Sequence, residues 1–216
     1  MSLQELVRAW QITASFHSFN PPATERDLEK VELELGFHLP VPLRELYLFS
    51  NGMHLLRGNL NIYPLLPENG KRALSNASIQ CRELFQIPPE VLVFGDNGSD
   101  EHYGIWNTEI KSEIFKHPIL EIGELFVDPD CMTVVATDLS PFLYGTTAFY
   151  ILSSAGSNEA LDVIGLPQEI RTGKDVSSNE HFSYIRKWID PLLPDPDPEP
   201  YTKGLDTAQI KKLFAK

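Results

Sequence analysis

The densest group of residues with catalytic side chains is Ser99-Asp100-Glu101-His102, which has a nucleophile, two carboxylates and an imidazole in succession. A Ser-His-Asp triad needs such groups to converge on one point. Neighbouring residues of a strand point to opposite faces, so this run does not form a triad by itself. We therefore expect no catalytic residue here and no enzymatic activity from the chain.

The same turn has the alternate spacing of a calcium-binding loop, with Asp96, Gly98 and Asp100 at its first, third and fifth positions. An EF-hand loop requires glycine at its sixth position and glutamate at its twelfth. Here the glycine stands at the third position and Asn107 occupies the twelfth. We therefore predict no metal ion at this turn.

Other motifs that carry chemistry are missing from the sequence. The histidines are separated, and none lies in an HExxH or HxH pattern that would place two imidazoles on one metal ion. The sequence also contains no GxxxxGK phosphate loop, no GxGxxG motif and no GxSxG elbow. It therefore predicts neither a cofactor nor a metal centre.

Contact with a partner protein is the alternative role for this turn. Asp96, Asp100 and Glu101 form one acidic loop, and Asp128-Pro129-Asp130 forms a second. If the strands between these loops pair closely, the carboxylates form one negative patch. Trp106 is then either an aromatic anchor beside the patch or a core residue, and tryptophan in a strand is more often core. We predict these residues as the partner-binding site.

The net charge of −12 over 216 residues is the most informative bulk property. Nucleic-acid binding needs clustered Lys and Arg to release counterions, and no such cluster occurs. An acidic balance favours cationic partners or simply confers solubility. No signal segment opens the chain, and no apolar run approaches the roughly 18 residues that span a bilayer. We expect a cytoplasmic protein without nucleic-acid or membrane partners.

Residues 24–52 predict two helices joined by a corner that contains prolines. Thr24 caps the first helix with Asp27 in the capping-box position, and Gly36 ends it. Pro42 begins the second helix, and Asn51-Gly52 ends it with left-handed residues. The first helix has an apolar inner face and a charged outer face. The inner residues are Leu28, Val31 and Leu35, and the outer ones are Glu25, Glu29, Lys30, Glu32 and Glu34.

The rest of the chain predicts further helices and short strands. A capping box at Ser2 and Glu5 begins a helix that runs to about Ser18, and Thr137 or Asp138 caps another. Short strands in succession pair antiparallel, which predicts an α+β fold with about four to six strands, two layers and a C-terminal extension. Residues 148–152 are consistent with either helix or strand. Other helices are expected at 71–85 and 179–191, and strands at 53–56, 59–65, 91–94, 103–106, 119–122 and 132–136. The expected inner face of the helix at 71–85 consists of Leu74, Ala77, Cys81, Leu84 and Phe85.

The C-terminal part of the chain has a different composition. Alternate prolines predict an extended acidic linker of about 3 Å per residue at 194–204, after a domain at 1–193. Asp206 caps a short helix at 205–216, which is too short to be stable alone. This helix must dock on its own domain or on a second copy, so we expect a monomer or a homodimer. Its apolar face consists of Ile210, Leu213 and Phe214.

Three stretches in this order resemble the SUKH superfamily, which includes the fungal cell-wall (glucan) synthesis regulators and many bacterial immunity proteins. They are the helix pair at 24–52, the strand and acidic glycine turn at 91–100, and the helix start at 135–143. The resemblance implies a non-catalytic protein-binding module. The implied role is an immunity protein that neutralises a polymorphic toxin, often a nuclease, or a regulatory scaffold like the fungal members. A hydrolase or small-molecule binder with a cleft around 96–106 is the third hypothesis.

Overall fold

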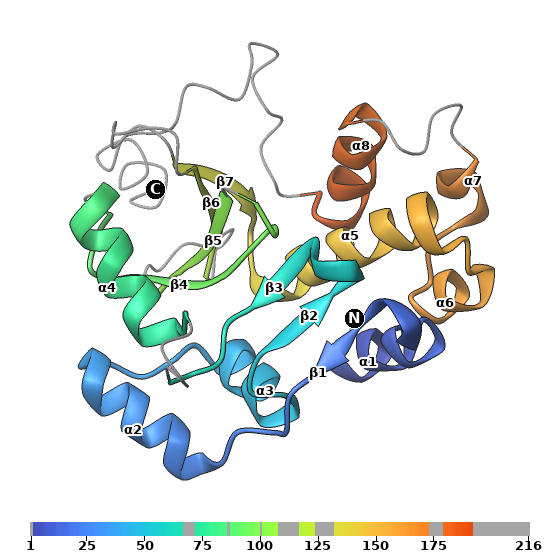
Figure 1. Ribbon diagram of the computed structural model, residues 1–216. Coiled ribbons are helices and arrows are strands. Elements are labelled where there is room, and N and C mark those ends of the chain that lie inside the picture. Colours follow the sequence, from blue (N-terminus) through green and yellow to red (C-terminus); the bar gives the residue numbers. More distant parts are fainter. Residues whose placement is uncertain are drawn as a thin grey trace.

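One antiparallel sheet organises the protein (Figure 1). The described residues of the computed structural model are 2–66, 72–85, 87–99, 101–107, 117–123, 132–172 and 179–191. Among these described residues, seven strands follow one another across the sheet in chain order. The α+β class and the antiparallel pairing are confirmed, and the strand number is above the expected range. The strands are β1 (Ser18–Phe19), β2 (Met53–Leu55), β3 (Leu60–Ile62), β4 (Val91–Asp96), β5 (Glu101–Trp106), β6 (Ile119–Gly123) and β7 (Met132–Ala136).

Helices pack on this sheet. Two of them, the short helices at Asn158–Val163 and Gln168–Arg171, were not predicted from the sequence. Within the described part of the chain, no helix is long and apolar enough to cross a bilayer. The predicted linker at 194–204 and the helix at 205–216 lie outside the described residues. The helices are α1 (Leu3–Ile12), α2 (Glu25–Leu35), α3 (Val41–Phe49), α4 (Leu74–Phe85), α5 (Leu139–Tyr150), α6 (Asn158–Val163), α7 (Gln168–Arg171) and α8 (Asn179–Ile189).

Both faces of the central strands are covered by helices. Alternate residues of a strand point to opposite faces. Phe94 packs toward α5, where its ring centroid lies 6.0 Å from that of Phe142. Val91 and Val93 point the other way, into a second apolar cluster that includes Cys81 of α4. Figure 1 shows α4 and α5 on opposite sides of the sheet, which adds a layer to the two expected.

The predicted caps of the first two long helices are confirmed. The Ser2 hydroxyl accepts a hydrogen bond from the Glu5 N–H, and the Glu5 carboxylate accepts one from the Ser2 N–H at 2.8 Å. Thr24 and Asp27 make the same reciprocal pair at the start of α2. Gly36 ends α2 in the left-handed conformation, with φ +81°. Local sequence therefore determines where these helices begin and where α2 ends.

The ends of α1 and α3 differ from prediction. α1 ends at Ile12 rather than near residue 18, because residues 18–19 pair with β2 and need extended backbone. α3 ends at Phe49, because the next residue, Ser50, has extended backbone. Of the two residues predicted to be left-handed, Asn51 and Gly52, only Gly52 has a positive φ. Asn51 instead uses its side-chain oxygen to accept a hydrogen bond from the Leu65 N–H at 2.9 Å.

The inner face of α4 agrees with the prediction at Leu74, Ala77 and Cys81, which are all buried, and differs from it at Leu84. Leu84 is 58% exposed, so the expectation that it faces inward is wrong. Ser78 is fully buried instead, and its hydroxyl accepts a hydrogen bond from the Val93 N–H at 2.9 Å. Ser78, whose polar contact with β4 joins the helix to the sheet, was not among the predicted inner residues.

The ambiguous residues 148–152 are helical. Asp138 caps α5, which continues to Tyr150 and then widens into a π-helical turn at Ile151–Ala155. Gly145 lies within α5, where a Cβ would stand 3.4 Å from a side-chain carbon of Arg186. The glycine therefore permits α8 to approach α5 closely.

The corner between α2 and α3 is held by the carboxylate of Glu32, which is only 7% exposed. Its Oε1 accepts hydrogen bonds from the Leu39 N–H at 2.9 Å and from Arg44, and its Oε2 lies 2.9 Å from His38 Nδ1. Burial alone would raise the pKa of Glu32, but the hydrogen bonds from these groups outweigh it and lower the pKa. The expectation that Glu32 lies in water is wrong, because the non-helical corner leaves donors that only a nearby acceptor can satisfy.

Replacing Glu32 by Gln should lower the free energy of unfolding by about 2 kcal/mol, because hydrogen bonds to a charged group are stronger than neutral ones. Urea denaturation measures this difference. Glu34→Gln on the exposed face of the same helix is the matched control and should change stability by less than about 0.5 kcal/mol. Equal effects of the two substitutions would contradict the role of Glu32.

Candidate partner-binding surface

Two turns lie side by side at one end of the sheet. We call residues 56–59, between β2 and β3, and residues 97–99, after β4, the paired turns. A Cβ added to Gly98 would stand 2.3 Å from the carbonyl oxygen of Gly58, so the two backbones are in direct contact. Leu56 and Arg57 have φ values of 57° and 60°, which non-glycine residues rarely adopt. The paired turns therefore hold strained backbone, a feature that concentrates at functional sites.

The strained turn is anchored to the end of α1. Its Leu56 N–H donates a hydrogen bond to His17 Nδ1 at 3.2 Å, so that nitrogen carries no proton. His17 Nε2 then donates to the Thr13 hydroxyl at 2.9 Å. Burial lowers the pKa of His17 to about 4, which keeps the ring in this neutral form. The guanidinium of Arg57 stacks 4.2 Å from the ring centroid of Phe16.

The predicted site residue Asp96 uses its carboxylate to hold the paired turns. Oδ1 accepts hydrogen bonds from the Asn61 side-chain amide at 2.6 Å and from the Gly98 N–H at 2.8 Å. Oδ2 accepts one from the Tyr63 hydroxyl at 2.7 Å. These bonds link β3, β4 and the turn that follows β4. Asp96 thus fixes the shape of this surface.

Tyr63 extends the network inward. Because its hydroxyl donates its one proton to Asp96, the Nδ1 of His102 must donate to the Tyr63 oxygen, at 3.1 Å. Burial raises the pKa of Tyr63, and its bond to Asp96 raises it further. Tyr63 and His102 are only 5% and 2% exposed. This arrangement is suited to holding the strands together, because both rings are shielded from anything in solution.

Glu101 points to the opposite face of the sheet from Asp96. Asp96 pairs with His102, whereas Glu101 precedes it and lies on the side of Tyr103. The Glu101 carboxylate accepts a hydrogen bond from the Asn97 side-chain amide at 2.6 Å. The structure therefore does not bring Asp96 and Glu101 into one patch.

The other predicted residues divide between the core and the part that is not described. Trp106 is 1% exposed and packs in the cluster beneath α4, so it occupies the core rather than the surface. Asp100, Asp128 and Asp130 lie outside the described residues. Their contribution to a partner-binding site stays a prediction.

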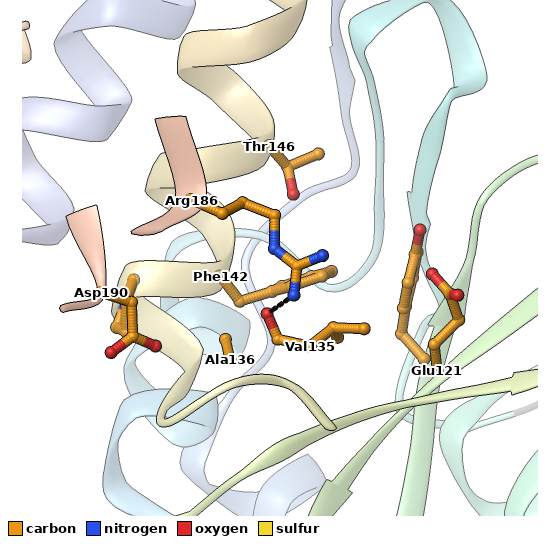
Figure 2. Close-up of a pocket in the computed structure, with 9 residues that line it drawn as sticks. Glu121, Val135, Ala136, Phe142, Thr146, Arg186 and Asp190 are labelled. Atoms are coloured by element: carbon orange, nitrogen blue, oxygen red, sulfur yellow. Dashed lines mark hydrogen bonds between the residues drawn. The ribbon is translucent and has the colours of Figure 1, made fainter. Parts of the chain in front are cut away.

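A small pocket on the α5 side contains ionisable groups that the sequence analysis did not single out (Figure 2). Figure 2 shows Glu121 of β6 across the pocket from Arg186 and Asp190. Arg186 donates a hydrogen bond to the carbonyl oxygen of Val135, and Asp190 accepts one from the Thr137 N–H at 2.7 Å. The cavity of about 20 Å³ has room for one water molecule.

Glu121 is the perturbed group of this pocket. Burial raises its pKa to about 7, the charge of nearby Glu101 adds to this, and Arg186 opposes it. The sequence signal was a carboxylate inside the apolar run Ile119–Ile122, which marks a charged residue on a strand. Its neighbours from β5 and α8 could not be inferred from that signal.

The described fold and surface define an α+β scaffold in which a rigid pair of turns ends a helix-covered antiparallel sheet. Residues 22–145 match the family described as SMI1 / KNR4 (SUKH-1). The chain belongs to this family. Comparison with curated proteins finds no match to the chain.

The contact between the paired turns can be tested with two glycines of nearly equal φ. Gly98→Ala should destabilise the protein by at least about 2 kcal/mol more than Gly36→Ala, because only the first would push a methyl group against backbone. Gly36 has φ +81° and no atom within 4 Å of the added Cβ, so it measures the cost of the φ angle alone. Chemical denaturation gives both values, and similar losses would contradict the close approach.

The pKa of Glu121 predicts a pH-dependent effect of Glu121→Gln. The folded-state pKa of about 7 exceeds the ordinary 4.5, so the folded protein binds this proton more tightly and loses stability as pH rises between these values. The Gln variant mimics the protonated form, so its stability relative to the native protein should rise by about 3 kcal/mol between pH 4.5 and pH 8. Glu83→Gln on the exposed face of α4 should show a pH-independent difference. A flat profile for Glu121→Gln would refute the pKa shift.

Proposed function

We propose that this protein is a non-catalytic protein-binding module that acts in the cytoplasm as an immunity protein against a basic, nuclease-type toxin. Membership of the SMI1/KNR4 (SUKH-1) family carries this proposal. The net charge of −12 supports a cationic partner. The function needs a rigid surface rather than reactive groups, and the paired turns supply such a surface.

Electrostatics explains how such a protein would work. A nuclease site that binds polyphosphate is cationic, so an acidic inhibitor associates quickly through long-range attraction. It then blocks the site by occupying it. Preorganised loops lose little conformational entropy on binding, which favours affinity.

Within this proposal the acidic residues flank the rigid turns. Asp100 follows the paired turns directly, and Asp128-Pro129-Asp130 lies between β6 and β7. Glu101 lies on the α5 side of the sheet. We propose that Asp100, Asp128 and Asp130 face the partner, while Asp96 keeps the turn in shape.

A regulatory scaffold like the fungal members is the second candidate. The observation that favours it is the length of the chain beyond the family match, which ends at residue 145 of 216. Such an extension suits a protein with more than one binding surface. A toxin-like reading frame beside the gene would favour the immunity role, and its absence would favour the scaffold.

If a toxin-like protein is encoded beside this chain, the immunity role can be tested with it. Coexpression should restore growth of cells that make the toxin, and the association rate should fall steeply as salt is raised. Asp100→Asn/Asp128→Asn/Asp130→Asn should slow association about tenfold at low salt. Stopped-flow fluorescence measures the rates.

The control removes the same charge elsewhere. Glu29→Gln/Glu34→Gln/Glu83→Gln takes three carboxylates from exposed helix faces and should slow association much less. Equal slowing by both triple variants would contradict the proposed interface. Association that is equally fast at low and high salt would contradict the electrostatic mechanism.

A further inference from the structure

An open groove lies among the helices on the α5 side of the sheet, away from the paired turns. Its volume of about 330 Å³ is within the range of small-ligand sites, roughly 300–1,000 Å³. Four helices that are far apart in the sequence line it: α1, α5, the end of α6, and α8. The lining residues are Glu5, Tyr144, Val163, Ile164, Gly165, Trp188 and Ile189.

The groove lining combines apolar side chains with the polar groups of Glu5 and Tyr144, and the partly exposed ring of Trp188 forms part of it. Trp188 is 41% exposed, although Trp10 and Trp106 are 0% and 1% exposed. Tyr184, one turn earlier on α8 and thus on the same side, is 54% exposed. Exposed aromatic side chains beside an apolar groove mark a surface that binds another apolar segment.

We propose that this groove is the docking site of the chain's own C-terminal segment, residues 205–216. The sequence predicts there an amphipathic helix that is too short to be stable without a surface to pack on. The apolar side chains of Ile210, Leu213 and Phe214 would lie against Trp188 and Ile164. This interaction is independent of the proposed toxin interface.

The chain leaves the described structure beside the groove. α8 ends at Ile189, which itself lines the groove. Residues 192–204 can span up to about 40 Å at 3.1 Å per residue, and a twelve-residue helix is about 18 Å long. The linker is therefore long enough for the helix to turn back at Gly204 and reach the groove.

Charge complements this arrangement. Glu5 is the one charged residue among the groove-lining residues, and its bonds from the Ser2 N–H and hydroxyl lower its pKa, which keeps it ionised. The C-terminal helix carries Lys211, Lys212 and Lys216 beside its apolar face. A basic amphipathic helix therefore fits a groove that combines apolar side chains with an acidic edge better than an acidic helix would.

Quenching of tryptophan fluorescence by acrylamide tests the docking in the full-length protein. Since Trp10 and Trp106 are buried, Trp188 accounts for most of the accessible emission. Leu213→Asp places a charge on the apolar face and should raise the quenching constant about twofold. Ala208→Asp adds the same charge two residues before Ile210, on the opposite side of the helix, and should leave the quenching constant unchanged.

Hydrogen exchange and molecular size complete the test. Leu213→Asp should also speed amide exchange at 160–166 and 184–189, without a change in the melting curve of the remaining domain. Unchanged quenching and exchange in Leu213→Asp would overturn the proposal. Quenching of the native protein that increases on dilution, together with a dimer in sizing experiments, would overturn it too, because a second copy would then fill the groove.

Discussion

The corner between α2 and α3 depends on one buried carboxylate, that of Glu32. The prolines stop helical hydrogen bonding and leave backbone groups that need another partner. Glu32 accepts from the Leu39 N–H and from Arg44, so it joins the end of the corner to both helices. The carbonyl of His38 in turn accepts a hydrogen bond from the Asn107 side chain at 2.9 Å, after β5. One ionised group therefore sets the angle of the helix pair and its place against the sheet.

The paired turns follow the same principle at the other end of the sheet. The positive φ angles of Leu56 and Arg57 cost free energy and persist only if surrounding contacts determine them. Such contacts come from His17, from the Phe16 ring and from the backbone approach at Gly98. Strain that is offset within the free protein does not have to be overcome again on binding, so a stiff surface keeps more of its interaction energy.

The starts of α1 and α2 and the end of α2 were predicted well, because their signals lie within a few neighbouring residues. The arrangement of the candidate site was not, because it depends on contacts between elements that are distant in the sequence. The cap at Thr24 and the stop at Gly36 are readable because the atoms involved are neighbours in sequence. The β-bulge between Val93 and Gly95 is not readable in this way. It shifts the pairing by one residue, so Asp96 lies opposite His102 rather than Glu101, and the two carboxylates face opposite sides. A single unpaired residue thus separates two acidic groups that the sequence placed together.

Hydrogen bonds and apolar packing join α8, which lies beyond the family match, to the sheet. Asp190, only 6% exposed, accepts hydrogen bonds from both the N–H and the hydroxyl of Thr137, just after β7. Arg186 donates to the Val135 carbonyl, and Ile185 is fully buried. Removing α8 would leave Thr137 and the Val135 carbonyl without these hydrogen bonds and would expose apolar surface. The resulting loss of folding free energy would be large compared with the net stability of a typical domain. We infer that α8 belongs to the same folding unit as the family region, which leaves the groove as a permanent feature of the domain.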